Sequence, residues 1–389
     1  MTEGFIPQRL FRRGGRASQM TGTGRFLIIS WDGGGNVPPA LNLGARLVRL
    51  GHRVRVLGWE SMQSRAATAG LEFAAYRSVP PWPSGVTFEQ AWKKRIIPAL
   101  FGEGTRDDIQ TEIKDFAPDA VVVDCMVGAG LEVADTLGLP RAVLIHVLYS
   151  MFMDKWGNNV TRANNAAYLD RAGQVLVLVP PGFETAYQLP PNTLDVGPIS
   201  DPNPSPPLSA GLTELLAEPG RPWVLLSLGT TLQDQARALP RILEAVARLP
   251  IRVLLTLDSG LQPSVINPPS NVMVCGFVPH DLLLPHMAAV VSHGGLSTIT
   301  GGLAAGVPLV CIPQGRDQPD NAERVVASGV GRAVSKHAKP AEIAAAIEAV
   351  LTDPAVLDKA SSFAHVIAAL GHGDVAARKV AALIGKSPH

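Results

Sequence analysis

The sequence predicts an α/β protein of two Rossmann-like β/α/β domains that face each other across a cleft. Short apolar stretches alternate with helical ones along residues 25–200, four prolines follow within 201–207, and the alternation then starts again. With 389 residues, the chain is too long for one ordinary core and has a suitable length for two. Pattern and length therefore indicate the same architecture.

The first domain is predicted from residue 25 to residue 200. The apolar run 26–30 is a strand, and a glycine-rich turn leads to a helix that begins near Pro38 and ends at Gly51. A second strand at 54–57 completes a β-α-β unit, which predicts a parallel sheet. The sheet continues with expected strands at 119–123, 141–146 and 174–179 and a helix at 129–137. Ligands of such sheets bind beyond the carboxyl ends of the strands, so the loops there are the candidate sites.

The second domain is predicted from 208 to 371, after a semi-stiff proline-rich linker at 201–207. Its expected strands lie at 223–228, 252–257, 272–275, 290–292 and 309–312, with helices at 237–248 and 296–305. Residues 372–389 are expected to end the chain with an apolar helix. Residues 1–24 are basic and rich in glycine but lack the apolar core of a signal peptide, so we expect a disordered leader.

Composition excludes several classes of function. Thirty-four Lys and Arg face thirty-three Asp and Glu, so the chain has no basic surplus for nucleic acid or an acidic membrane. No apolar run approaches the ~18 residues of a membrane-spanning helix. Cys125, Cys275 and Cys311 stand far apart in apolar stretches, which favours buried, reduced thiols and a cytoplasmic protein.

Two strand-to-helix loops of the second domain combine glycines with hydroxyls. One follows the strand at 290–292, and its amides and hydroxyls lie where a helix begins; these residues are His293, Gly294, Gly295, Ser297 and Thr298. The other follows the strand at 223–228 and contains Ser227, Gly229 and Thr230. Because the start of a helix offers free N–H groups and a positive dipole end, the two loops together predict a cradle for a diphosphate.

The segment 290–332 resembles the donor signature of the UDP-glycosyltransferase superfamily, most closely its bacterial antibiotic and macrolide branch. The residues that match are His293-Gly-Gly295, Ser297-Thr298, Gly306-Val-Pro308, Asp317-Gln318, Asn321-Ala-Glu-Arg-Val325 and Gly329-Val-Gly331. The resemblance extends over about residues 25–385. It implies the GT-B fold, a nucleotide diphosphate sugar as co-substrate with no further cofactor, and a C-terminal helix that packs back onto the first domain.

The resemblance also implies individual roles. His293 and the loop around Gly295 would bind the diphosphate, Asp317 and Gln318 would hold sugar hydroxyls, and the segment with Phe277 and Val278 would face the base. Plant members carry a glutamate for the ribose hydroxyls eight residues after the histidine, where this chain has Gly301. A dTDP-linked donor, whose nucleotide contains deoxyribose instead of ribose, would lose the least binding affinity from that change.

The catalytic base that the resemblance implies is missing. Family members place a histidine in the loop after the first strand and orient it with an aspartate, which here is Asp124. The position of the histidine is taken by Asn36, and an amide cannot accept a proton at neutral pH.

Four interpretations remain open. Asp124 could itself be the base, with Asn36 positioning the acceptor, or the acceptor could be acidic enough to need little help. Asp32 or His146 could serve instead, or the protein could be an inactive homologue or a variant made to trap substrates.

An apolar acceptor pocket is expected in the first domain, because 18 of the 21 aromatic residues precede residue 201. The residues that we assign to it are Trp31, Trp82, Phe88, Met126, His146, Tyr149 and Phe152.

The predicted function is inverting, metal-independent transfer of a sugar from a UDP- or dTDP-linked donor to a small lipophilic acceptor, as in natural-product biosynthesis. No Asp-X-Asp metal motif lies beside the donor loops, so the helix start would stabilise the leaving diphosphate. The alternatives are a silent nucleotide-sugar-binding homologue and a sugar-nucleotide epimerase. An NAD-dependent oxidoreductase is disfavoured, because the third glycine of the dinucleotide fingerprint is Pro38.

Overall fold

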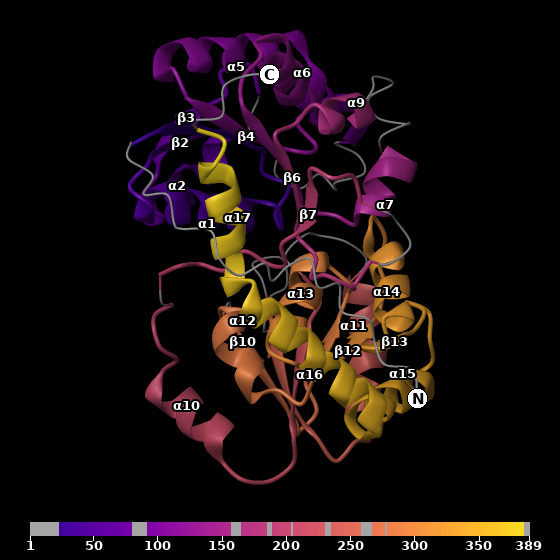
Figure 1. Ribbon diagram of the computed structural model, residues 1–389. Helices are drawn as coiled ribbons and strands as arrows, with labels where there is room; N and C mark the ends of the chain where they lie inside the picture. Colours follow the sequence, from indigo (N-terminus) through magenta and orange to yellow (C-terminus); the bar gives the residue numbers. More distant parts are fainter. Residues whose placement is uncertain are drawn as a thin grey trace, which may run out of the picture.

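The computed structural model describes residues 23–79, 92–156, 165–184, 189–203, 205–229, 235–257, 267–276 and 278–384. These residues form two parallel β-sheets with helices packed around each (Figure 1). The α/β class and the two-sheet architecture that the sequence predicts are thereby confirmed.

The first sheet has seven strands in the order β3-β2-β1-β4-β5-β6-β7, all pairs parallel. The bounds of its strands are β1 Arg25–Ile29, β2 Arg53–Gly58, β3 Glu72–Ala75, β4 Ala120–Asp124, β5 Arg141–Ile145, β6 Gln174–Val177 and β7 Thr193–Asp195. The central strands β1, β4 and β5 are adjacent, so their carboxyl ends meet at one place on the edge of the sheet.

The second sheet has six parallel strands in the order β10-β9-β8-β11-β12-β13. Its strands are β8 Trp223–Ser227, β9 Arg252–Thr256, β10 Val272–Cys275, β11 Ala289–Ser292, β12 Leu309–Cys311 and β13 Gly331–Ala333. Strands β8 and β11 are neighbours, so the two glycine-containing loops that follow them lie side by side, as the cradle hypothesis requires.

Helices connect the strands in both domains. In the first domain they are α1 Val37–Arg49, η2 Glu60–Met62, α2 Gln63–Thr68, η3 Trp92–Ile96, α4 Ile97–Phe101, α5 Glu103–Phe116, α6 Gly128–Thr136, α7 Tyr149–Met151, η4 Phe152–Trp156 and α9 Asn165–Asp170. The later ones are α10 Ala210–Ala217, α11 Gln235–Val246, α12 His280–Leu283, η6 Leu284–His286, α13 Leu296–Ala304, α14 Gln318–Ala327, α15 Pro340–Thr352, α16 Pro354–Ala369, η7 Gly371–Gly373 and α17 Asp374–Ala381. In the part of the chain that the structure describes, no helix is both long and apolar enough to cross a membrane.

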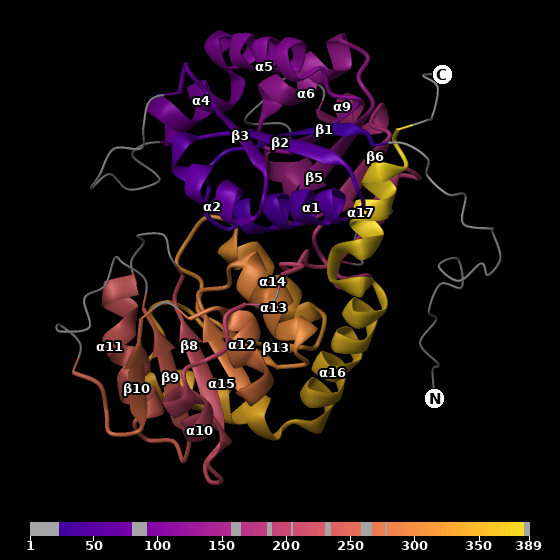
Figure 2. The same cartoon turned by 90° about the vertical axis from the view of Figure 1, so that its left-hand side faces the viewer.

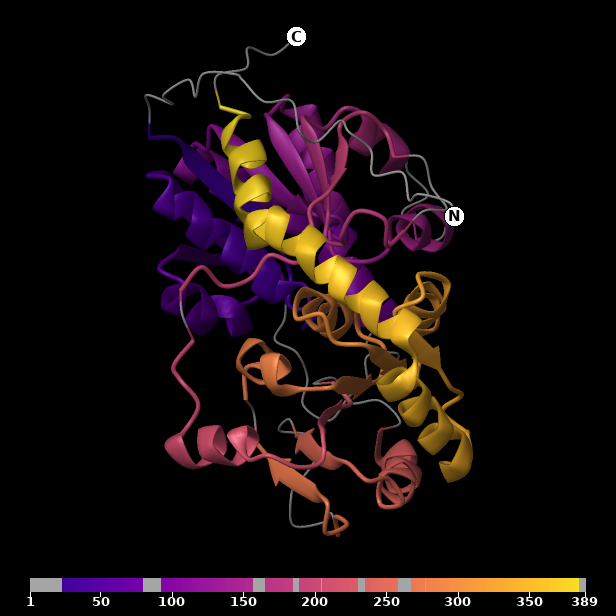
Figure 3. The same cartoon turned by 60° about the horizontal axis from the view of Figure 1, so that its bottom comes forward.

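The last two helices join the domains. Helix α16 packs on α13 of the second domain, and α17 packs on α1 of the first, so the C-terminal stretch runs along both (Figures 2 and 3). Ala376, Ala377 and Val380 of α17 belong to the first-domain core, and Asp374 pairs with Arg46 of α1. Phe183 and Phe363 also pack edge to face between the domains, with ring centroids 6.0 Å apart.

The predicted strands all occur, with ends shifted by at most two residues. The strands that sequence patterning missed are β3, β7 and β13, each of three or four residues. Such short edge strands bury too few side chains to give a recognisable apolar run. Of the leader predicted at 1–24, residues 1–22 lie outside the described residues, as does Pro204 of the linker.

Candidate functional site

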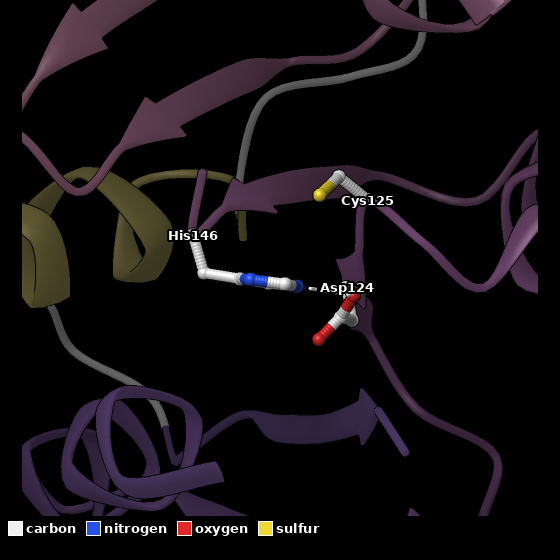
Figure 4. Close-up of side chains that lie close together, drawn as sticks. All are labelled: Asp124, Cys125 and His146. Atoms are coloured by element: carbon white, nitrogen blue, oxygen red, sulfur yellow. Dashed lines mark hydrogen bonds and ion pairs between the residues drawn. The ribbon is translucent and has the colours of Figure 1, made fainter. Parts of the chain in front are cut away.

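A cluster of polar side chains lies at the carboxyl edge of the first sheet, on the central strands β1, β4 and β5. Asp124 is the last residue of β4, and His146 follows β5 (Figure 4). His146 Nε2 is 3.1 Å from Asp124 Oδ1, and the hydroxyl of Ser30, which follows β1, donates to Asp124 Oδ2 at 3.4 Å. The parallel register of the sheet thus brings together residues that are distant in sequence.

Asn36 completes this cluster from the first loop. Its Nδ2 donates to Asp124 Oδ2 and to the carbonyl oxygen of Trp31, both at 2.8 Å, while its Oδ1 accepts from the N–H of Gly33 at 3.0 Å. The side chain is buried and held on three sides, so its amide orientation is fixed by these partners. The residue in the expected place of the base therefore contacts Asp124, as that histidine would.

Asp124 carries a buried negative charge. Burial alone would raise the pKa of its carboxyl, but His146, the Asn36 amide and the N–H of Met126 hold that pKa below its usual value. Burial likewise opposes charge on His146, yet the neighbouring carboxylate raises the pKa of the imidazole well above its ordinary value. The two groups stabilise each other's charged forms across one hydrogen bond.

Cys125 lies beside this pair, and Asp124, Cys125 and His146 offer possible metal-ligand atoms within 4.8 Å of one another. Both Asp124 oxygens already accept hydrogen bonds from protein groups. Burial also raises the pKa of the Cys125 thiol, which favours its protonated, non-ligating form. The arrangement suits proton chemistry better than ion binding.

Asp32, the other carboxylate predicted near the base, is engaged elsewhere. Its Oδ2 pairs with Arg65 at 2.5 Å and accepts from the Ser61 hydroxyl at 2.7 Å. Asp32 Oδ1 accepts from the N–H of Gly34 at 3.3 Å. These contacts hold the carboxylate on the α2 side of the loop and give no support to a role as base.

The loops after β8 and β11, called the donor loops because the sequence predicts that they bind a nucleotide diphosphate, meet around His293. Adding a Cβ atom to Gly229 or Gly295 would bring it within 2.6 Å of the imidazole, so only glycine fits on either side of the ring. Burial lowers the pKa of His293 to about 4, and its buried Nδ1 has no hydrogen-bond partner among the described residues. The imidazole is therefore neutral at pH 7 and offers a hydrogen bond rather than a positive charge.

The start of helix α13 faces the cleft. Gly295 is the N-cap residue and provides no side chain for the free N–H groups of the first turn. Ser297 is exposed there and donates its hydroxyl to the carbonyl oxygen of Gly35 at 3.2 Å, which links the donor helix to the first-domain loop. Thr298, half-buried, lies in the same turn.

The loop before α14 is tied to the loop before α13 by a buried amide. Asn321 Nδ2 donates to the carbonyl oxygen of Gly294 at 3.0 Å and to Asp317 Oδ2 at 2.9 Å. Gln318 is almost fully buried, and its Oε1 accepts from the N–H groups of Gln314 and Gly315 at 2.8 and 3.2 Å. The side-chain oxygen of Gln318 thus shapes the loop, whereas Asp317 is partly exposed.

A cavity of about 400 Å³ lies between the domains. The first domain contributes Gly35 and His146 to its lining, and α13 contributes Ser297, Thr300 and Gly301. Most other lining residues are apolar, and they include Pro38, Pro39, Leu178, Pro198, Ile199, Leu284, Pro285 and Leu296. His280 also lines the cavity, but it is not among the residues predicted from the sequence. It comes two residues after Val278, which is half-buried and belongs to the segment predicted to face the base.

The residues predicted to bind the acceptor are placed differently from one another. Trp31, Met126, Tyr149 and Phe152 are each at most 3% exposed and belong to the large core cluster, where they do not line the cavity. His146 does line it. Trp82, Phe88, Thr230 and Phe277 lie outside the described residues. Aromatic composition alone could not separate pocket residues from core residues, because both are apolar and follow strand ends.

Comparisons with known proteins match this architecture. Residues 240–383 match the family described as erythromycin biosynthesis protein CIII-like, C-terminal domain. The 4'-demethylrebeccamycin synthase of Lentzea aerocolonigenes is 27% identical over 396 residues, which covers 85% of this chain and 92% of that protein.

Solved structures share the fold over nearly the whole length. The crystal structure of CalG4, the calicheamicin glycosyltransferase, has a TM-score of 0.77 at 24% identity and covers 94% of this chain and 100% of its own. Spinosyn rhamnosyltransferase SpnG complexed with thymidine diphosphate has a TM-score of 0.72 at 19% identity, with coverage of 92% and 100%.

Proposed function

Since this chain is a glycosyltransferase of the GT-B fold with an erythromycin CIII-like second domain, we propose that it transfers a sugar to a small lipophilic natural product. The donor is a nucleotide diphosphate sugar, and the reaction inverts the anomeric carbon without a metal ion. The single observation that supports this most is the cavity between the domains, because His146 from one domain and the start of α13 from the other both line it.

The donor half of the proposal rests on the loops after β8 and β11. The free N–H groups at the start of α13, Thr298 and the neutral His293 offer donors to a diphosphate, and Ser297 joins them when its hydroxyl turns away from Gly35. Asn321 ties these loops to Asp317, whose partly exposed carboxylate we expect to accept a hydrogen bond from a sugar hydroxyl. A helix start stabilises negative charge on a leaving diphosphate, which is the task that a metal ion performs in other transferases.

Inversion is supported by the two-sided lining of the cavity. An acceptor that approaches from the first domain would attack the anomeric carbon from the face opposite to the diphosphate on α13. One displacement of this kind inverts the configuration. Nuclear magnetic resonance of the product anomer tests it, and a retained configuration would refute this part of the proposal.

We infer a preference for dTDP over UDP donors. Gly301 lines the cavity and presents no side chain to a ribose hydroxyl. A donor without the 2'-hydroxyl therefore loses little binding affinity. The similar rhamnosyltransferase was solved with thymidine diphosphate. Calorimetric titration with dTDP and UDP measures the difference, and a clear preference for UDP would contradict the inference.

A lipophilic acceptor fits the mainly apolar cavity lining, and the relatives are named for natural-product acceptors. The three cysteines are free, which supports a site of action in the reducing cytoplasm. The decisive experiment incubates the protein with dTDP-glucose or UDP-glucose and a panel of phenols, polyketides and sterols, and detects products by mass.

Each outcome of that panel assigns one function. A sugar adduct on an acceptor supports the transferase. A chemically altered nucleotide sugar without an adduct would instead support the epimerase alternative. Binding of nucleotide sugar with no product on any acceptor would indicate the silent homologue. That alternative rests on Asn36, which stands where the resemblance implies a catalytic histidine.

A further inference from the structure

Asp124 is too enclosed to touch an acceptor. The carboxylate is 1% exposed, and both its oxygens are occupied by four groups of the protein. Oδ1 faces the N–H of Met126 and the ring of His146, while Oδ2 accepts from Asn36 and Ser30. A group with no free surface can act on a substrate only through one of these neighbours.

His146 is the neighbour that reaches the substrate space. Its side chain is 12% exposed, and it lines the cavity between the domains. It is also the neighbour of Asp124 that can accept a proton, because Asn36 offers an amide and Ser30 a hydroxyl. We propose that His146 is the catalytic base of this enzyme, and that Asp124 orients it as the family's aspartate orients the histidine of the first loop.

The proposal rests on the proposed sugar transfer and also assigns a role to Asn36. Asn36 lies 2.8 Å from Asp124 and is a positioning residue, because its amide holds Oδ2 while Oδ1 faces His146. The base has thus moved from one side of the same carboxylate to the other. If His146 is the base, an active enzyme can carry asparagine at position 36.

Neutral His146 donates its Nε2–H to Asp124 Oδ1 and accepts the acceptor's hydroxyl proton at Nδ1. The acceptor oxygen forms a bond to the anomeric carbon, the bond from that carbon to the phosphate oxygen breaks, and its electron pair leaves with the nucleoside diphosphate. The imidazolium that results is stabilised by the Asp124 carboxylate.

The titration of this base is set by its surroundings. Burial disfavours the imidazolium, but Asp124 and, to a smaller extent, Cys125 outweigh it and raise the pKa. The other titratable groups that line the cavity are His280, Asp281 and His372. Because the neutral ring is the active form, turnover should fall as the pH drops below a pKa that lies above the ordinary value for histidine.

The main test replaces His146 with asparagine and measures transfer from dTDP-glucose and UDP-glucose to 4-ethylphenol, whose hydroxyl stays protonated at neutral pH as that of tyrosine does. We expect kcat to fall about 10²- to 10⁴-fold, the usual contribution of general-base assistance, while the dissociation constant of the nucleotide stays unchanged. The loss should be smaller with 4-nitrophenol, because a more acidic hydroxyl needs less help. If the histidine were merely structural, its replacement would lower kcat by the same factor with both acceptors.

The matched control is His52→Asn. His52 is also a buried, hydrogen-bonded histidine of the first domain, but it lies at the start of β2, at the opposite edge of the sheet. Its replacement should leave kcat close to that of the wild type. Circular dichroism and nucleotide binding verify that both variants fold.

Two further variants protect the test from a folding artefact. Imidazole added to His146→Ala should restore part of the activity. Asn36→His in the His146→Asn background should restore more, because it returns a histidine to the other side of Asp124. If His146→Asn keeps wild-type kcat and pH profile, the assignment of the base is wrong. If the wild type itself forms no product, the proposed sugar transfer fails instead.

Discussion

The polar groups on the two sides of the cleft differ in how their charges are arranged. The first-domain cluster is built around a buried carboxylate, Asp124, whose charge is balanced by His146. The donor loops instead combine neutral donors, namely the backbone at the start of α13, the Asn321 amide and His293 with a pKa of about 4, with the oppositely charged Arg316 and Asp317. A group that moves a proton needs a charged partner, whereas a group that holds an anion can rely on oriented dipoles.

The largest effect should follow when the buried charge is removed. In Asp124→Asn, the His146 ring loses its orienting carboxylate and the imidazolium loses its stabilising charge. We expect kcat to fall on the order of 10³- to 10⁴-fold, with donor binding nearly unchanged. Steady-state kinetics and nucleotide titration measure both quantities. A variant that keeps turnover would show that Asp124 takes no part in proton transfer.

A change of pH should separate the two regions. Turnover is expected to drop about tenfold per pH unit below the raised pKa of His146, because one proton inactivates the base. His293 stays neutral well above its pKa of about 4, so the affinity for an uncleaved nucleotide sugar should be flat from pH 6 to pH 9. Calorimetry over that range provides the check. An affinity that follows the turnover would mean that the two sites share a titrating group.

A smaller effect is expected from the amide that joins the donor loops. Asn321→Ala leaves the carbonyl of Gly294 and the carboxylate of Asp317 without this partner at a fully buried position. The unfolding free energy should decrease by about 1–3 kcal/mol, and the Michaelis constant for the donor should rise. Urea denaturation measures the first. Asn203→Ala, at an exposed position of the linker, is the control and should change neither quantity.

The smallest effect should come from the ion pair that crosses the cleft. Lys155 and Asp320 bring the domains together at a site where the lysine side chain is 59% exposed. Because water and salt screen such pairs, Lys155→Met should change the unfolding free energy by less than about 1 kcal/mol. Thermal unfolding at low and high salt is the measurement. A large, salt-sensitive loss would show that this contact controls domain closure.

Much of the fold was predictable because its signals are local. The apolar runs of β1, β4, β8 and β11 are each followed by glycine-containing or polar loops, so both the alternation and the donor loops could be found in the sequence. The short strands β3, β7 and β13 could not, because three or four residues carry too weak a pattern. The acceptor pocket was harder still, since Trp31 and Phe152 are as apolar in a core as they would be in a pocket.

The sequence by itself determined which groups are present: a motif around His293 that resembles a donor signature, an aspartate at the end of β4, and an amide where the resemblance implies a catalytic histidine. Only the tertiary structure decided which histidine meets that aspartate. Strand β5 lies beside β4, and their register pairs Asp124 with Leu144, which places His146 just beyond the end of the strand. The partner is chosen by the order and register of strands rather than by proximity in sequence, because parallel strands bring their carboxyl ends together whatever length of chain connects them.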